Sequence, residues 1–165
     1  MLRAGLAGLA ALLLIPASTS AAPETPAAPA AERIYFPAEP NADFILETAV
    51  ADARERGQLA VIVFGADWCH DSHYLARVLT STAFEQAYGK RLAVTFIDVG
   101  KPQTGEGRNL DLVAGLGVQR LRSTPALFVL NGAGIPLNST RDAVSWRNAE
   151  KRGEAAILAA FRRYR

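Results

Sequence analysis

The segment Leu59–Ser72, LAVIVFGADWCHDS, decides the fold class and locates the chemistry. Its first six residues form an unbroken apolar run, which is typical of a strand covered on both faces of a sheet. Gly65 ends the run, and the polar stretch behind it holds Cys69, the one cysteine of the chain. Ligands of open α/β sheets bind beyond the carboxyl ends of the strands. We therefore expect Cys69 to lie at a functional site.

Further helices and strands alternate on both sides of this segment, as apolar spacing and Gly or Asn breaks indicate. The expected strands are 59–64, 92–99, 126–130 and 135–137. The expected helices are 41–57, 84–88, 109–115, one from about 154, and a stretch after Trp68–Ser72 that holds Tyr74, Leu75, Val78 and Leu79. Residues 100–107 are expected to form a loop. This order predicts an α/β fold with a mixed central sheet of about four to five strands and helices on both faces.

Composition bounds the possible functions. A chain of 165 residues predicts one domain, because domains typically run to about 100–150 residues. With 18 Lys plus Arg against 16 Asp plus Glu, the net charge is too small to suggest a nucleic-acid or polybasic membrane protein. A single cysteine excludes an internal disulfide, a Cys-x-x-Cys redox pair and a multi-cysteine metal site within one chain.

The N-terminal residues have the pattern of an export signal. Residues 1–22 contain 15 apolar residues and one charge, and their apolar run is followed by small residues. We expect cleavage there, a Pro/Ala-rich linker over 23–33, a domain over 34–165, and an exported protein that is periplasmic or secreted. Such a run is too short to span a bilayer comfortably, since spanning takes about 20 residues, and no stable span is expected after cleavage. The alternative is an uncleaved N-terminal anchor.

Two elements in order resemble the thioredoxin-like superfamily. The stretch from Ala66 to Ser72 is similar to the active-site segment of that family, in which Trp-Cys-x-x-Cys opens a helix. Some 55 residues later, Ser123-Thr124-Pro125 and the apolar strand behind it resemble the family's cis-proline loop. The resemblance implies a thioredoxin-like fold and thiol–disulfide exchange.

The resemblance also implies that Thr124 and Pro125 dock an extended substrate across a groove from Cys69, with Trp68 as one wall of the groove. The alternatives are an ordinary trans proline that starts an edge strand and a Trp68 that packs into the core.

The expected chemistry at Cys69 follows from its neighbours. The thiolate is the nucleophile, and a helix N-terminus or a nearby cation favours that ionised form. A protonated His70 would add attraction, and Ser72 could donate a hydrogen bond to the sulfur. We therefore predict a site formed by Cys69, His70 and Ser72.

The chain departs from the family pattern at two positions. Ser72 stands where the second, resolving cysteine would be, and Val63 stands where the family tends to have a buried acid. A mixed disulfide at Cys69 must then be discharged by a thiol from outside the chain. This predicts monothiol reduction of mixed disulfides or disulfide isomerisation, with client proteins or small thiols as partners. The alternative is a non-catalytic binding module that keeps the fold and its groove.

We expect neither a metal nor another cofactor. The alternative is a partial metal site, because Cys69 and His73 are four residues apart and His70 is adjacent to Cys69.

Overall fold

A three-stranded mixed sheet lies at the centre of the computed structural model, which describes residues 33–164. Its strands are β1 (Leu59–Gly65), β2 (Leu92–Asp98) and β5 (Ala126–Leu130), in the order β2-β1-β5. The central strand β1 runs parallel to β2 and antiparallel to β5. The predicted signal segment 1–22 and the linker, apart from Arg33, lie outside the described residues.

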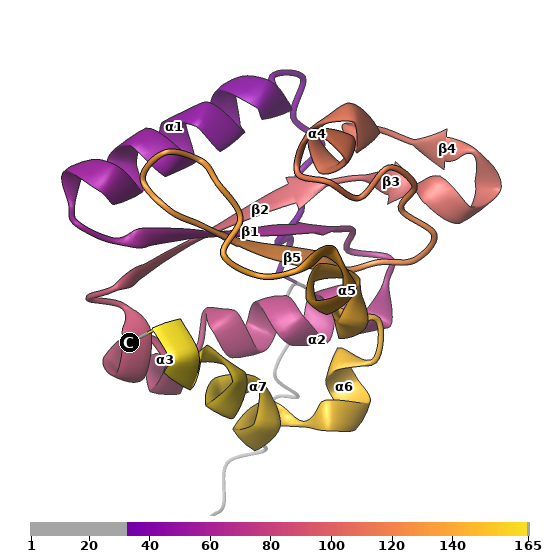
Figure 1. Cartoon of the computed structure of the whole chain (residues 1–165). Helices are drawn as coiled ribbons and strands as arrows, with labels where there is room; N and C mark the ends of the chain where they lie inside the picture. Colours follow the sequence, from indigo (N-terminus) through magenta and orange to yellow (C-terminus); the bar gives the residue numbers. More distant parts are fainter. Residues whose placement is uncertain (1–32, 165) are drawn as a thin grey trace, which may run out of the picture. The chain divides into compact units, whose positions relative to one another are not determined.

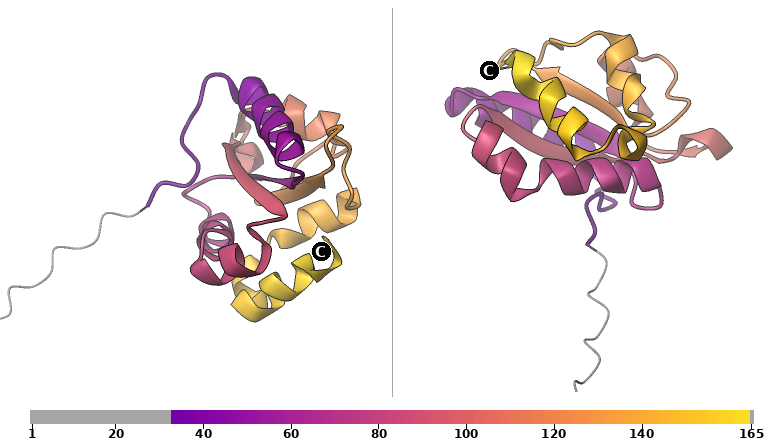
Figure 2. Two further views of the ribbon diagram at one scale, coloured as in Figure 1. Left: turned by 90° about the vertical axis from the view of Figure 1, so that its left-hand side faces the viewer. Right: turned by 90° about the horizontal axis from the view of Figure 1, so that it is seen from below.

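Helices cover both faces of the sheet, which confirms the predicted α/β class (Figures 1 and 2). One face is covered by α1 (Ala42–Glu55) and α4 (Leu110–Gly115), and the other by α2 (His70–Leu79), α3 (Thr82–Tyr88) and α7 (Glu154–Ala160). Side chains of β1 alternate between the two faces. Ala60, Ile62 and Phe64 pack on one side, and Val61 and Val63 on the other.

The main sheet has fewer strands than expected. The predicted strand over 135–137 is reduced to one bridge between Leu130 and Pro136. Beyond that bridge the buried side chain of Asn138 takes the place of a neighbouring strand, because its Oδ1 accepts from Val129 N at 2.9 Å and its Nδ2 donates to Leu127 O at 2.8 Å. A side chain therefore satisfies the backbone groups that a fourth strand would pair with.

The segment 100–107 is a small hairpin, where the sequence predicted a loop. Its strands are β3 (Gly100–Lys101) and β4 (Glu106–Gly107), joined by the 3-10 turn η1 (Pro102–Thr104). Gly105 closes the turn with a φ of 83°, a backbone conformation that glycine adopts without a steric penalty. A strand of two residues is too short to show the alternation of apolar and polar side chains, so the sequence pattern does not predict it.

The C-terminal part contains more helix than expected. Besides α7, it includes the short helices α5 (Thr140–Ala143) and α6 (Ala149–Arg152) and the 3-10 turns η2 (Val144–Trp146) and η3 (Phe161–Tyr164). Trp146 packs this connection onto the domain, since it is 2% exposed and stacks on Phe161 with ring centroids 5.9 Å apart. No helix within residues 33–164 is both long and apolar enough to cross a bilayer.

Candidate active site

Cys69 lies directly before α2, beyond the carboxyl end of β1. Its backbone is extended (φ −89°, ψ 115°), its N–H donates to Ala66 O at 3.0 Å, and its carbonyl accepts from His73 N at 2.9 Å. The thiol is free and half-buried. Cys69 is therefore the N-cap residue of a ten-residue helix, whose positive end attracts an anion, and its side chain makes no capping hydrogen bond.

A second segment reaches the sulfur from β5. The Thr124–Pro125 peptide bond is cis, and both residues are buried. The Cys69 thiol donates to Thr124 O at 3.6 Å. Two of the residues expected to dock substrate thus come next to the nucleophile, where a backbone carbonyl meets the thiol.

Ser72 is close in sequence to the sulfur but makes no hydrogen bond with it. The side chain is fully buried, and its Oγ has no hydrogen-bond partner among the described residues. The space around it is tight, because a Cβ added at Gly65 would lie 2.9 Å from the Ser72 Oγ and 2.7 Å from the Phe36 ring. The predicted hydrogen bond from Ser72 to Cys69 is therefore wrong, since the hydroxyl lies beneath α2, next to Gly65 at the end of β1.

His70 faces another helix. Its ring is 77% exposed, and Nδ1 lies 3.0 Å from Glu150 Oε2. Asp71, the next residue, accepts a hydrogen bond from the Glu150 backbone N–H at 3.0 Å, and so caps the start of α6. Sequence reasoning missed Glu150, which lies some 80 residues from His70 and shows no local motif.

Trp68 is 52% exposed, so it does not belong to the core. Its indole N–H donates to Gly100 O at 2.9 Å, which ties the active-site segment to the β3–β4 hairpin. The two segments border a pocket of about 500 Å³. Its other lining residues are Phe36, Asp67, Asp98, Lys101, Glu106 and Arg108.

Four of the five charged side chains of this pocket form two ion pairs. Asp98 lies 3.1 Å from Arg108 Nη1 and also accepts from Gly100 N at 3.2 Å. Lys101 Nζ lies 4.0 Å from Glu106 Oε2. The pocket therefore presents no surplus cation to a substrate.

Asp67 fastens the start of the domain to the active-site segment, a role that sequence reasoning missed. Its two carboxylate oxygens accept from Tyr35 N at 2.9 Å and Phe36 N at 3.0 Å. Nearby, His73 Nε2 lies 3.1 Å from Arg33 O, and the ring packs edge-on against Tyr35. A carboxylate directly before Trp68-Cys69 was the signal that could have indicated this clamp.

The described residues contain no group of three or more His, Cys, Asp or Glu side chains arranged to hold a metal ion. His73, one of the side chains weighed as a ligand, is turned toward Arg33 and Tyr35.

Comparisons with known proteins give two matches. A family model described as thioredoxin-like matches residues 42–132. A crystal structure of a disulphide isomerase from Xylella fastidiosa Temecula1 aligns with a TM-score of 0.65 and 28% sequence identity, over 78% of this chain and 95% of that one. None of the curated sequences compared with the chain gives a significant match.

Proposed function

The chain belongs to the thioredoxin-like family, and we propose that it carries out thiol–disulfide exchange through Cys69 alone, with a resolving thiol from outside. One observation carries the proposal: a free sulfur at the start of α2 lies 3.6 Å from the carbonyl of Thr124, beside a cis peptide bond. The similarity to a protein named as a disulphide isomerase supports the same class of reaction.

In the proposed reaction the Cys69 thiolate attacks one sulfur of a client disulfide. A Cys69–client disulfide forms, the client's S–S bond breaks, and the other client sulfur leaves as a thiolate that takes up a proton. No net oxidation occurs in this step. The N–H groups and dipole at the start of α2 stabilise the attacking thiolate.

Discharge of this intermediate needs a second thiol, and the chain holds none. Ser72 occupies the position of a resolving cysteine, and a serine hydroxyl does not take part in thiol–disulfide exchange. Val63 is fully buried among apolar side chains, at the position where the family tends to have an acid. A small thiol, or a second cysteine of the client, would attack the client–Cys69 bond and regenerate the free thiol.

Around the sulfur we assign the remaining roles by position. Thr124 and Pro125 would border an extended client segment, and the exposed Trp68 ring would form an outer wall. His70, held next to Glu150, would contribute a positive charge near the thiolate when protonated. Ser72 would be a buried side chain near the end of β1 that makes no hydrogen bond to the sulfur.

We place this activity outside the cytoplasm. Residues 1–22 would direct export and be removed, and the linker over 23–33 would separate the domain over 34–165 from the cleavage site. Disulfides persist in oxidising compartments outside the cytoplasm, where a single reactive thiol meets disulfide-bonded client proteins. Fusing residues 1–33 to an alkaline phosphatase that folds only after export tests this: activity is expected, and an inactive fusion would contradict it.

A refolding assay tests the exchange reaction. The protein is mixed with ribonuclease carrying scrambled disulfides and a small thiol, and recovered ribonuclease activity is measured. Cys69→Ser should lose the acceleration, and mass spectrometry should find a ribonuclease adduct only on the wild-type protein. Binding to ribonuclease without adduct or acceleration would favour a non-catalytic binding module, the second candidate, which the absent resolving thiol supports.

A further inference from the structure

Positive charge is concentrated in one part of the chain, on either side of the Thr124–Pro125 bond. Residues 117–152 carry six cationic side chains and two acidic ones, whereas acidic residues outnumber basic ones in the rest of the sequence. The cationic residues are Arg120, Arg122, Arg141, Arg147, Lys151 and Arg152, and the acidic ones are Asp142 and Glu150.

Both acidic residues of this segment already lie next to basic side chains. Asp142 pairs with Arg163, and Glu150 lies 3.0 Å from His70. Arg152 stacks on Trp146 and donates to Ser145 O. The other five cationic side chains are exposed, and none of them forms an ion pair within residues 33–164. We call these five residues the basic rim.

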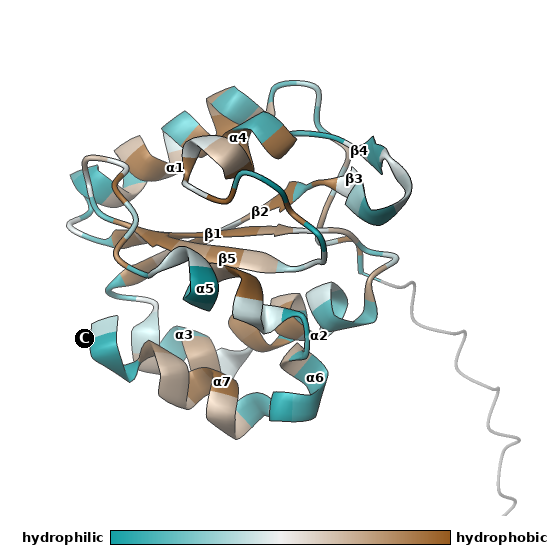
Figure 3. Cartoon of the chain, turned by 45° about the vertical axis from the view of Figure 1, so that its right-hand side comes forward, coloured by the Kyte–Doolittle hydropathy of each residue, from teal (hydrophilic) through white to brown (hydrophobic). Residues whose placement is uncertain are grey.

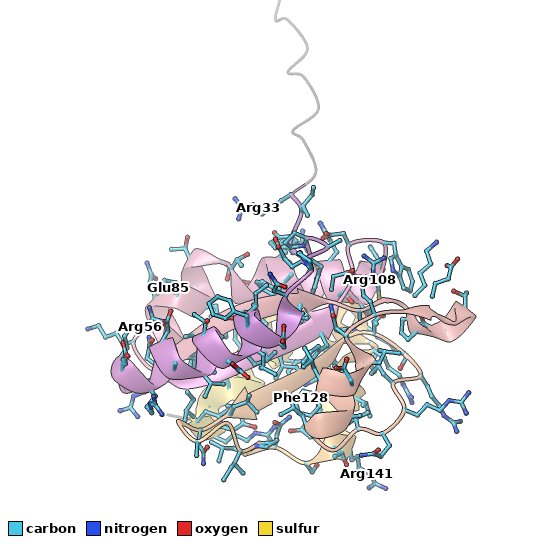
Figure 4. All side chains as sticks on the ribbon, turned by 90° about the horizontal axis from the view of Figure 1, so that it is seen from above. Arg33, Arg56, Glu85, Arg108, Phe128 and Arg141 are labelled. Carbon is cyan, nitrogen blue, oxygen red and sulfur yellow. The ribbon has the colours of Figure 1, made fainter. Side chains whose placement is uncertain are left out.

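The basic rim lies at the same end of the molecule as Cys69. In Figure 1 the loop before β5, α5 and α6 all lie near the start of α2, and Figure 3 shows them largely in the teal of hydrophilic residues. Arg141 projects outward from the edge of the molecule in Figure 4. Arg120 and Arg141 also line one hollow of about 270 Å³ between that loop and α5. Two members of the rim thus border a hollow whose lining includes no acidic residue.

We propose that the basic rim binds acidic side chains of the peptide segment whose cysteine reacts with Cys69. This inference rests on the proposed exchange reaction and names its substrate class. Arg122 and Arg120 precede Thr124 by two and four residues, so they lie within roughly 7 and 14 Å of it along the chain. A client in extended conformation has the same rise per residue. Its acidic residues should therefore stand two to four positions from its cysteine.

The β3–β4 hairpin, which is bonded to Trp68, does not offer the same attraction. There Lys101 and Arg108 are paired with Glu106 and Asp98. An acidic segment would have to break those pairs, whereas the basic rim needs no rearrangement. The charge complementarity therefore favours one direction of the client across the site.

The test uses two nine-residue peptides with one central cysteine, blocked as a pyridyl disulfide. One carries Glu at the positions two and four residues from the cysteine, and the other carries Gln there. Cys69 attacks the peptide sulfur, forms a Cys69–peptide disulfide and releases pyridine-2-thione, whose absorbance gives the rate. At low ionic strength the Glu peptide should react about fivefold faster, the effect expected of two exposed ion pairs.

Two double variants assign that preference. Arg120→Gln/Arg122→Gln should bring the two rates to within about twofold, and about 0.5 M salt should do the same to the wild-type protein. Lys90→Gln/Arg91→Gln removes two exposed charges before β2, at the other end of the sheet, and should keep the preference. Equal wild-type rates, or a preference that survives the rim variant, would overturn the proposal.

A binding measurement separates this inference from the exchange reaction. Fluorescein-labelled peptides with serine in place of cysteine are titrated with the protein, and anisotropy is followed. Rim-dependent binding of the Glu peptide supports the acidic-client surface even if Cys69 proves unreactive. If Cys69 reacts with both peptides at equal rates, the acidic-client proposal is contradicted, while the proposed exchange reaction is still supported. Rim-dependent binding to phosphatidylglycerol vesicles without peptide binding would replace the acidic client with a membrane surface, and so overturn the proposal.

Discussion

The Cys69 sulfur lies 3.6 Å from the carbonyl oxygen of Thr124, a residue 55 positions later in the chain. Antiparallel pairing of β1 with β5 produces this contact, because Phe64 near the end of β1 stands opposite Ala126 at the start of β5. Both segments of the site are thus held by one buried sheet.

Replacing Ser72 with cysteine should convert the site from one thiol to two. In Ser72→Cys the new thiol is three residues from Cys69 along α2, a spacing that allows a disulfide after small shifts. Mild oxidation should remove both free thiols, because they form a disulfide with each other. The lifetime of mixed disulfides with clients should fall by about tenfold or more, because resolution becomes intramolecular. Thiol titration and the decay of trapped adducts measure these two effects.

Ala87→Cys provides the matched control, since it adds a thiol at an exposed position of α3, away from the site. It should keep two free thiols and an unchanged adduct lifetime. Adducts of equal lifetime in Ser72→Cys and Ala87→Cys would contradict the proposed geometry of discharge.

Removing the carboxylate of Asp67 should destabilise the domain. It accepts two partly buried backbone N–H groups, of Tyr35 and Phe36, so Asp67→Ala should lower the free energy of unfolding by about 2 kcal/mol. Urea denaturation followed by circular dichroism gives the value. Asp52→Ala removes an exposed acid of α1 and should change stability by less than about 0.5 kcal/mol. A similar small change for Asp67→Ala would show that the clamp adds no stability.

Loss of the Asp71 side chain should loosen α6 locally. Its carboxylate caps the Glu150 N–H, so Asp71→Ala should cost about 1 kcal/mol, the usual value of a helix cap. Hydrogen exchange at the Glu150 amide should accelerate accordingly. Glu150→Gln keeps that amide and its cap while removing the charge beside His70, and should leave the exchange rate nearly unchanged. Equal acceleration in both variants would refute the capping role.

Replacing Asn138 should affect stability more strongly than the other changes. Asn138→Ala leaves Val129 N and Leu127 O buried without their partner, which should cost about 2–4 kcal/mol. The midpoint of thermal unfolding should fall by several degrees in differential scanning calorimetry. Asn41→Ala is a suitable control, because that exposed side chain makes no capping bond. An Asn138→Ala protein as stable as this control would show that water or a backbone shift replaces the lost bonds.

The central strands and the two longer helices that flank them could be predicted from local sequence. β5 is buried throughout and β1 from Ala60 onward, and both are continuous apolar runs. The polar segment after β1 marks the start of α2. Burial on both faces forces an apolar side chain at each position, so the signal is strong even in a short strand.

Other features depended on partners far away in the chain. The polar residue Asn138 gave no indication that its side chain would stand in for a strand, and the short helices α5 and α6 have too few residues for a periodic pattern. Likewise, the contact between His70 and Glu150 joins two residues with no shared motif. Each of these arises only when segments pack together.

The sequence by itself determined the number of thiols, the serine at position 72 and the strand that carries Cys69 to the edge of the sheet. These are properties of composition and of nearest neighbours, which folding does not alter. The tertiary structure alone decided what each side chain meets. It brings Thr124 to the sulfur and Glu150 next to His70. It also brings the backbone of Tyr35 and Phe36 to Asp67, and buries the Ser72 hydroxyl. Hydrogen bonds and ion pairs act over a few ångströms, so they depend on which distant segments the packed core brings together.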